Sequence, residues 1–289
     1  MFDAIGTFVE DGGRWQIDHL VGATSGTTAP SAEEAPDEFV KYCEELAGQL
    51  PATSDLRAWV DGAKQNDVAL IRRAVDTNTL SAAEAAVLAD ALLGVLCALL
   101  GGSHRLSGKV DSRLIHDVRF EERYADTQLG AGCQELDWHV EDGCHGELRP
   151  TWLLILCLVG GPTVRTKVAR LRDMPMSDEM TQSLLESEIE LRLDESFQDS
   201  ESTRFPVSIL ADGAAGREII FDPAFTVESD EATTLVQAVR RIADVVHSEI
   251  VLEAGDLMIL NNRTCIHGRS GFDPEGPDRF RYIKRALAN

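Results

Sequence analysis

Residues 151–159 read TWLLILCLV, an apolar run that stands between a proline and a glycine. Four similar short runs follow, each bounded by Gly, Pro, Asp or Asn, at residues 205–210, 218–221, 250–252 and 257–260. Evenly spaced short strands of this kind are typical of a β-sandwich or a β-barrel. The later part of the chain is therefore predicted to form a core of strands.

Three helices are predicted before these strands. The first begins near Pro36, a residue suited to the first turn of a helix, and the second covers about residues 56–75. The third begins with a capping box, in which the Ser81 hydroxyl and the Glu84 carboxylate each satisfy an orphan backbone donor, and ends at the glycine pair 101–102.

A fourth helix, at about residues 231–246, interrupts the strands with one apolar stripe. Residues 21–36 are rich in Gly, Ser, Thr, Ala and Pro, and are predicted to form a surface loop. The fold class is therefore α+β, as one domain over residues 1–289, with a helical region at about 36–102 packed on a core of strands at about 103–289.

The composition limits the partners and the compartment. The 289 residues include 27 Lys and Arg against 49 Asp and Glu, so the formal net charge of −22 disfavours nucleic acid and anionic membranes. The longest apolar stretch, residues 87–100, is broken by Asp90 and is shorter than the ~20 residues that a bilayer needs. Six cysteines without CxxC spacing, and a start without the pattern of a signal peptide, predict a cytoplasmic protein with reduced thiols.

Half of a metal site is indicated by residues 135–147, which read ELDWHVEDGCHGE. In a strand, His139 and Glu141 project from the same face because they lie two positions apart. Non-haem iron(II) oxygenases hold their metal with two histidines and one carboxylate on one side. Alone, this triplet is a weak signal, and a solvated pair on a loop is the alternative interpretation.

A second histidine stands near the C-terminus, in residues 253–272, which read EAGDLMILNNRTCIHGRSGF. His267 follows His139 by 267 − 139 = 128 residues, far enough for a sandwich to bring opposite strands together. The alternative is a polar residue that closes a loop.

Arginines are clustered in residues 279–285, which read RFRYIKR and are predicted to form a terminal strand. By parity, Arg279, Arg281 and Arg285 share one face of it. A guanidinium can bind a carboxylate with two parallel hydrogen bonds, so these side chains suit a dicarboxylate. A solvated basic edge strand is the alternative.

Three blocks of this sequence resemble those of one known family. Residues 136–142 are similar to the L-x-W-H-x-E-D motif of clavaminate synthase-like enzymes, within the taurine dioxygenase-like superfamily. Residues 255–272 resemble that family's G-D-L, N-R, H-G-R and F block, and residues 281–285 its closing R-W-L-K-R. The resemblance covers roughly the C-terminal two-thirds of the chain.

The resemblance implies a double-stranded β-helix (jelly-roll) core with N-terminal and inserted helices. It implies an iron(II)- and 2-oxoglutarate-dependent dioxygenase, with O2 as the second cosubstrate. His139, Glu141 and His267 would bind iron(II), and Arg281 would pair with the distal carboxylate of 2-oxoglutarate.

Further roles implied by the resemblance leave alternatives open. Thr166 is expected to help at the distal carboxylate, with Thr163 as the other candidate, and Arg285 to assist at a substrate or cosubstrate carboxylate or to form a structural ion pair. In one alignment the segment after His267 is two residues short, which selects Arg279 instead of Arg281. The family's usual Asp-Asn is Asn261-Asn262 here, so a hydrogen bond around the metal ligands is expected to differ.

The implied reaction is hydroxylation of an unactivated C–H bond of an amino acid or a derivative, free or carrier-bound, in specialised metabolism. An arginine-like substrate is favoured, because an acidic lining could recognise a cationic side chain. The candidate carboxylates are Asp222 and Asp142, and Gln134 and Glu135 lie just upstream of the metal motif.

The sequence is also compatible with other functions. A zinc hydrolase could use His139, His145 and a carboxylate, although HxE-x3-H lacks the one-face helical spacing of HExxH. Desaturation or cyclisation could follow from the same cofactor chemistry. A jelly-roll binding protein without catalysis is the non-enzymatic alternative.

Overall fold

Two sheets form the centre of the molecule. The computed structural model describes residues 6–8, 30–105, 113–193, 203–213 and 216–289. The larger sheet has the strand order β1-β2-β12-β5-β14-β3, with bounds, in that order, of Gly6–Phe8, Val68–Ile71, Leu257–Asn261, Trp152–Val159, Tyr282–Ala288 and Ile115–Arg119. The smaller sheet has the order β11-β6-β13-β4, with bounds Ser248–Ile250, Thr166–Arg170, Cys265–Arg269 and Leu136–His139. All neighbours in both sheets pair antiparallel except β1 and β2, which are parallel.

The remaining elements surround these sheets. Two further antiparallel strand pairs are β7 (Ile189–Arg192) with β8 (Arg204–Val207) and β9 (Leu210–Gly213) with β10 (Gly216–Ile219). The α-helices are α2 (Pro36–Gln49), α3 (Asp55–Asn66), α4 (Ala82–Leu100), α5 (Asp178–Glu186) and α6 (Asp230–Val246). The 3-10 helices are η1 (Glu122–Tyr124), η2 (Gly143–Leu148), η3 (Leu171–Asp173) and η4 (Pro277–Phe280).

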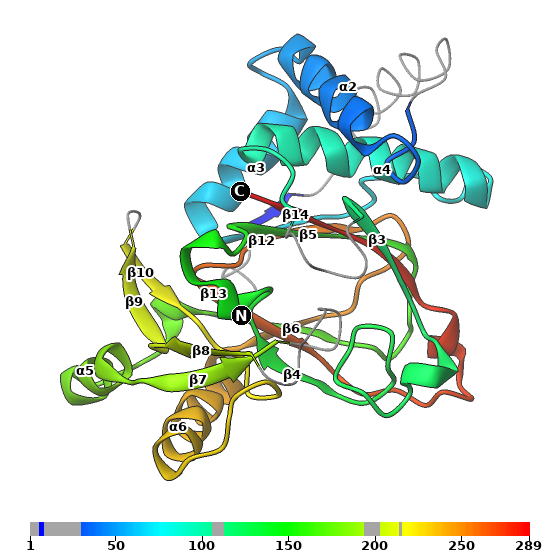
Figure 1. Ribbon diagram of the computed structural model, residues 1–289. Coiled ribbons are helices and arrows are strands. Elements are labelled where there is room, and N and C mark those ends of the chain that lie inside the picture. Colours follow the sequence, from blue (N-terminus) through cyan, green and yellow to red (C-terminus); the bar gives the residue numbers. More distant parts are fainter. Residues whose placement is uncertain (1–5, 9–29, 106–112, 194–202, 214–215) are drawn as a thin grey trace.

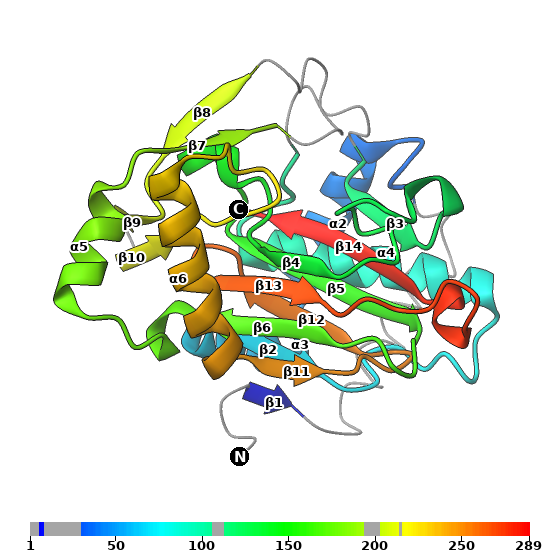
Figure 2. The same ribbon diagram turned by 90° about the horizontal axis from the view of Figure 1, so that it is seen from below.

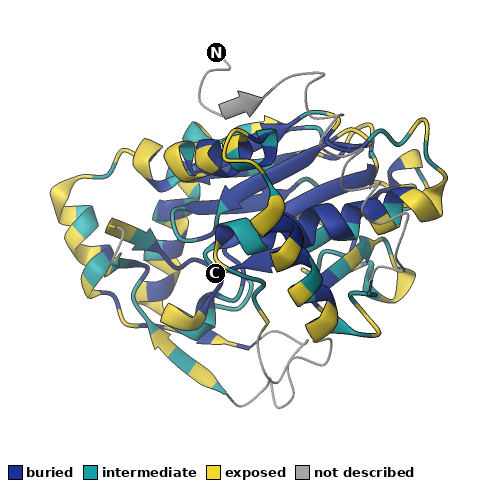
Figure 3. Cartoon of the chain, turned by 90° about the horizontal axis from the view of Figure 1, so that it is seen from above, coloured by how far each residue is buried: buried dark blue, intermediate teal, exposed yellow. Residues whose placement is uncertain are grey.

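The sheets face each other and are covered on both outer sides. Helices α2, α3 and α4 lie over the outer face of the larger sheet (Figure 1), and α6 crosses the outer face of the smaller sheet (Figure 2). Buried residues are concentrated on the central strands and on the helix faces that meet them, and exposed residues on the outward faces (Figure 3). The layers are thus helices, six-stranded sheet, four-stranded sheet and helix.

Side-chain alternation along the strands divides the core into three clusters. In β5, Leu154 and Leu156 pack with the α2–α4 helices, whereas Leu153, Ile155 and Cys157 pack between the two sheets. Both faces of β5 are therefore buried, which explains why residues 151–159 are apolar without alternation. The third cluster lies between the smaller sheet and α6.

The predicted α+β class is confirmed, and three of the predicted helices are found as α2, α4 and α6. Both halves of the capping box are present at the start of α4, where the Ser81 hydroxyl accepts from the backbone of Glu84 and the Glu84 carboxylate accepts from the backbone of Ser81. By length and composition, helix α4 is long and apolar enough to cross a membrane, but 61% of its most apolar stretch is buried inside the protein. It is the core helix that the sequence predicted.

The prediction of one helix over residues 56–75 was wrong in its second half. Helix α3 ends at Asn66, Asp67 takes a left-handed conformation with φ 64°, and β2 follows. All four residues of β2 are buried between β1 and β12, and this burial outweighs their local helical pattern.

Other boundaries also differ from prediction. The predicted strand 205–210 is divided between β8 and β9, and helix α5, which begins after the N-cap Ser177, was not foreseen. The predicted strands at 218–221 and 250–252 each end two residues earlier, as β10 and β11. Of the predicted loop 21–36, residues 21–29 lie outside the described residues, residues 30–35 form a turn before α2, and Pro36 is the first residue of that helix.

Substitution of Gly255 would show how tightly the turn before β12 packs against the segment after β2. Its φ is 91°, and a Cβ there would strike the carbonyl oxygen of Val75. Gly102 has a similar φ of 115° but open space around it, so it is a matched control. Backbone strain should lower the free energy of unfolding by about 1–3 kcal/mol in both Gly→Ala variants. The clash should add about 1–3 kcal/mol more in Gly255→Ala alone, as measured by denaturant unfolding. Equal losses in the two variants would contradict this packing.

Candidate active site

Strands β4 and β13 bring the two predicted histidines together. The strands pair antiparallel with His267 directly opposite His139, and their ring centroids are 4.1 Å apart. His267 lies on the same side of β13 as Cys265, which packs between the sheets, while Ile266 faces the α6 layer. The two imidazoles therefore stand inside the sandwich.

Glu141 completes the cluster, two residues beyond His139 and just past the end of β4. The ligand-capable atoms of His139, Glu141 and His267 all lie within 4.8 Å of one another. His267 Nε2 is 3.6 Å from Glu141 Oε1. In the part of the chain that the structure describes, this is the group of His, Cys, Asp and Glu side chains that could hold a metal ion.

The protonation states suit a divalent metal. Burial, followed by the charge of His267, lowers the pKa of His139 to about 4, so this imidazole is neutral near pH 7. Burial would raise the pKa of Glu141, but the charge of Arg285 and the contact with His267 outweigh it and hold that pKa well below its usual range. A carboxylate and neutral imidazoles are the forms that bind metals.

Hydrogen bonding also fits a metal centre. His139 Nδ1 is 2.8 Å from the carbonyl oxygen of Asp137, an interaction that orients the ring and leaves Nε2 for a ligand. His267 Nδ1 is buried and has no hydrogen-bond partner among the described residues, so protein hydrogen bonds alone do not satisfy this ring. Two histidines and a carboxylate are the donor set of non-haem iron(II) oxygenases.

The C-terminal arginines do not share one strand face, so that part of the prediction was wrong. Arg279 lies in η4, which begins at Pro277, and its side chain is 42% exposed and pairs with Glu275 at 3.7 Å. Arg281 directly precedes β14 and is only 9% exposed, and no hydrogen bond or ion pair of its guanidinium is found within the described ranges. The geometry favours Arg281 over Arg279 as the arginine of a buried carboxylate site.

Arg285 crosses from the larger sheet to the triad. Its Nη1 atom is 3.1 Å from Oε1 and 2.9 Å from Oε2 of Glu141. Of the alternatives for Arg285, the structure thus contains the ion pair, and its partner is the proposed metal ligand itself.

The two threonine candidates differ in their surroundings. The Thr163 hydroxyl donates to Asp278 Oδ2 at 2.6 Å, so it is committed to a structural contact. Thr166, in β6, is 5% exposed and lies opposite Arg269 of β13 in the register. Thr166 therefore remains the candidate for a ligand contact.

The upstream candidates Gln134 and Glu135 face outward. Glu135 forms an ion pair with Lys167 at 2.5 Å, and Gln134 donates to Asp126 at 3.3 Å. Both residues are exposed, which disfavours a role inside the site.

Asp142 and Asp222 lie beside the triad segment. Asp142 follows Glu141 in a left-handed conformation, with φ 56°. Asp222 follows Phe221, whose carbonyl accepts a hydrogen bond of 2.9 Å from the Val140 backbone. Both residues are partly buried.

Arg269 was not singled out from the sequence, and Asn262 was noted there only as part of the Asn261-Asn262 pair, without a contact of its own. Arg269 donates to the carbonyl oxygens of Gly130 at 3.2 Å and Gln134 at 2.6 Å, and burial, followed by the charge of Arg281, lowers its pKa to about 10. The side-chain amide of Asn262 is hydrogen-bonded to both the N–H and the carbonyl oxygen of Glu141. The H-G-R and N-R motifs contain these residues, but a motif does not say which backbone groups a side chain reaches.

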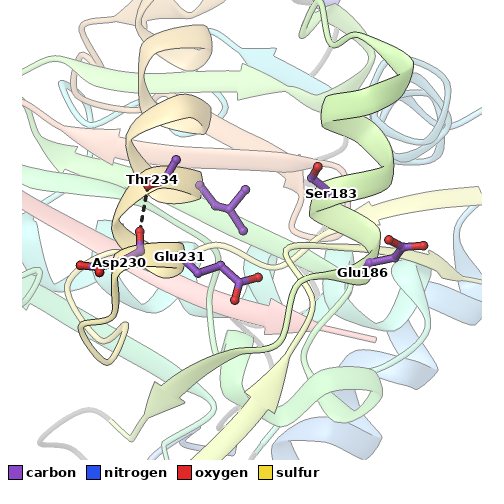
Figure 4. A pocket seen from close by; sticks show the side chains of 6 residues that line it. Ser183, Glu186, Asp230, Glu231 and Thr234 are labelled. Atoms are coloured by element: carbon purple, nitrogen blue, oxygen red, sulfur yellow. Dashed lines mark hydrogen bonds between the residues drawn. The ribbon is translucent and has the colours of Figure 1, made fainter.

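A separate cavity of about 590 Å³ lies between α5 and α6 (Figure 4). It is lined by Ser183, Glu186, Asp230, Glu231, Thr234 and Leu235. It lies outside the smaller sheet, so it is separate from the triad on the inner side.

Fold and cluster together define a class of protein, a sheet sandwich with a two-histidine, one-carboxylate centre of the non-haem oxygenase type. The model of the family "Taurine catabolism dioxygenase TauD, TfdA family" matches residues 179–287. The predicted resemblance to this family is thereby confirmed.

Two characterised relatives that resemble this chain are amino-acid oxygenases by name. The chain is 31% identical to L-asparagine oxygenase of Streptomyces coelicolor over 213 residues, which is 71% of this chain and 62%, less than two-thirds, of the relative. It is 23% identical to enduracididine beta-hydroxylase of Streptomyces hygroscopicus over 254 residues, 78% of this chain and 74% of the relative.

The fold is shared over nearly the whole chain. A structure of asparagine oxygenase with Fe(II), 2S,3S-3-hydroxyasparagine and succinate has a TM-score of 0.83 at 23% identity, covering 99% of this chain and 93% of that one. The non-haem iron oxygenase OrfP with Fe, succinate and (3S)-hydroxy-L-Arg has a TM-score of 0.79 at 20% identity, covering 98% and 93%. The predicted enzyme class, an iron(II)- and 2-oxoglutarate-dependent oxygenase, is confirmed by the family match together with the characterised relatives.

A metal titration distinguishes this centre from the zinc hydrolase alternative. His145 lies against Phe205, with ring centroids 5.8 Å apart, and is not part of the cluster. His267→Ala should lower the affinity for Co(II), a spectroscopic substitute for iron, by at least about 100-fold because it removes one of three ligands. His145→Ala should leave the affinity unchanged in the same anaerobic absorbance titration. The reverse pattern would favour a site built on His139 and His145.

Proposed function

We propose that this protein hydroxylates an unactivated C–H bond of a free amino acid with a cationic, arginine-like side chain. The observation that carries the proposal is the cluster of half-buried His139 with buried Glu141 and His267 on the inner side of a sandwich that also buries Arg281. A metal centre and a buried cation in one interior are what an oxygenase with an anionic cosubstrate requires.

His139, Glu141 and His267 are the proposed ligands of iron(II). When bound, iron(II) and 2-oxoglutarate activate O2, so that one oxygen atom enters the substrate C–H bond and the other enters succinate as CO2 is lost. The protein's own contribution is to hold the ligands, to exclude water and to fix the substrate. The neutral state of His139 and the ionised state of Glu141 prepare the site for the metal.

Arg281 is the proposed partner of the distal carboxylate of 2-oxoglutarate, with Thr166 beside it. A buried guanidinium whose donors are not hydrogen-bonded is costly, and a carboxylate that binds it in two hydrogen bonds offsets that cost. The charge of Asp278 acts on Arg281 from nearby, but among the described residues no hydrogen bond or ion pair joins the two side chains, so the donors of the guanidinium are left for a ligand. We assign Arg285 mainly to holding Glu141, since both carboxylate oxygens are within its reach.

The substrate proposal rests on charge and on the relatives. Relatives of this chain include L-asparagine oxygenase, L-lysine hydroxylases and an L-ornithine/L-arginine 3-hydroxylase. Asp142 and Asp222 stand beside the triad segment, in a chain with a net charge of −22. Both suit an ammonium or guanidinium group better than a neutral side chain.

We make further proposals about the core, the domain organisation and the cellular location of the protein. We propose that the two facing sheets form a double-stranded β-helix core and that residues 1–289 are a single domain. We also propose a cytoplasmic enzyme of specialised metabolism, and the net charge of −22 supports small molecules rather than nucleic acids or anionic membranes as its partners.

A substrate screen tests the reaction. With Fe(II), ascorbate and 2-oxoglutarate, a cationic amino acid such as arginine should gain one oxygen atom by mass spectrometry, with one succinate per product. Products that lose two hydrogens would indicate desaturation or cyclisation instead. A blank screen of the free amino acids, with succinate formed only from a carrier-bound substrate, would contradict the free-amino-acid proposal. No turnover with either kind would favour a binding protein.

Arg279, two residues before Arg281, is a matched control for the role proposed for Arg281. Arg281→Gln should raise the KM for 2-oxoglutarate by at least about 30-fold, because loss of a buried charged partner costs about 2–5 kcal/mol. Arg279→Gln removes an exposed charge and should change that KM by no more than about twofold. A larger effect at Arg279 in steady-state succinate assays would select the alternative alignment.

A further inference from the structure

Glu141 stands outside the sheet that holds its partner histidines. Strand β4 ends at His139, and Asp142 turns the chain with a left-handed φ of 56°. The ladder of hydrogen bonds that fixes His139 and His267 therefore does not reach the backbone of Glu141. Arg285 binds the carboxylate of Glu141, but another group must hold its backbone in place.

One side chain does so. Asn262 Oδ1 accepts from the backbone N–H of Glu141 at 2.7 Å, and Asn262 Nδ2 donates to the carbonyl of Glu141 at 3.0 Å. The same Nδ2 donates to the carbonyl of Pro150, also at 3.0 Å. The side chain is fully buried, so the oxygen and both N–H groups of this amide are used without water.

Asn262 is itself held at a crossing of three chain segments. It lies in the turn between β12 and β13, five residues before His267, and its backbone N–H donates to Thr151 at 2.7 Å, next to β5. A shift of the β12–β13 turn would thus move Glu141 together with His267. This link joins two metal-ligand segments that are far apart in the sequence.

We propose that Asn262 is a positioning residue for the metal centre, whose amide sets the place of Glu141 relative to His139 and His267. The inference rests on the proposed iron site. Residues behind metal ligands commonly change metal affinity or activity by about 10–100-fold when replaced, because ligand geometry tolerates only small displacements. A purely structural amide would affect stability alone.

Two substitutions separate these roles. Asn262→Asp keeps the shape and the acceptor for the Glu141 N–H, but loses both donors and sets a carboxylate oxygen against two carbonyls. Asn262→Ala removes all three bonds without adding charge. Ser187→Ala is the matched control, because the Ser187 hydroxyl is also buried, donates to Leu184 at 2.8 Å and accepts from Ile209 at 3.0 Å, in the layer on the other side of the smaller sheet.

Each variant is titrated with Co(II) without oxygen, beside the wild type, and its thermal midpoint is measured. Both Asn262 variants should bind Co(II) about 10–100-fold more weakly, while Ser187→Ala loses stability but keeps its affinity within about twofold. Unchanged affinity in the Asn262 variants, or an equal loss in Ser187→Ala, would overturn the inference. A wild type that binds no Co(II) would instead refute the proposed metal site.

A second measurement needs no variant. In the metal-free wild type, hydrogen exchange should find the Glu141 amide as protected as the amides of β13, because it is bonded to a buried acceptor. Exchange at the rate of an open loop would exclude the bond on which the inference depends. This result stands even if substitutions at Asn262 prevent folding.

Discussion

The antiparallel pairing of β4 with β13 is the constraint on which the site depends. It places His267 opposite His139 and, by alternation, turns both imidazoles inward while Ile266 turns toward α6. A shift of one residue in this register would exchange the two faces of β13 and place Ile266 in the position of His267, a proposed metal ligand. The apolar layers on both sides of the smaller sheet therefore stabilise the register that orients the two histidines, as well as the fold itself.

The interior between the sheets combines apolar packing with unusual charge. Leu153, Ile155 and Cys157 fill one part of it, while Arg281 and Arg269 are buried close enough for each charge to act on the other. Two like charges in a poorly polarisable interior repel each other, and an anion between the sheets relieves both. The oxygenase class supplies such an anion in its cosubstrate, so this charge distribution and the family agree.

The sequence specified much of this arrangement. The continuous apolar run of β5, the capping box of α4 and the His-x-Glu and His-Gly-Arg motifs were sufficient for the fold class and for the three clustered residues. It could not specify β2, because Val68–Ile71 continues a helical pattern and becomes a strand only through its neighbours β1 and β12. Pro277 and the turn of η4 removed Arg279 from the strand that parity assumed. The amide of Asn262 is recognisable only when the chain has folded, since its partners are backbone groups that are 121 and 112 residues away.

The ion pair between Arg285 and Glu141 has a consequence for how the protein matures. Because a guanidinium from the opposite sheet already balances the carboxylate of Glu141, the cluster does not need a metal cation to neutralise that charge. Domains whose acidic or thiolate ligands lack such a balance fold only when metal arrives. If the proposed site binds iron, the polypeptide can thus fold first and take up the metal afterwards, so that folding and metal loading are separate stages.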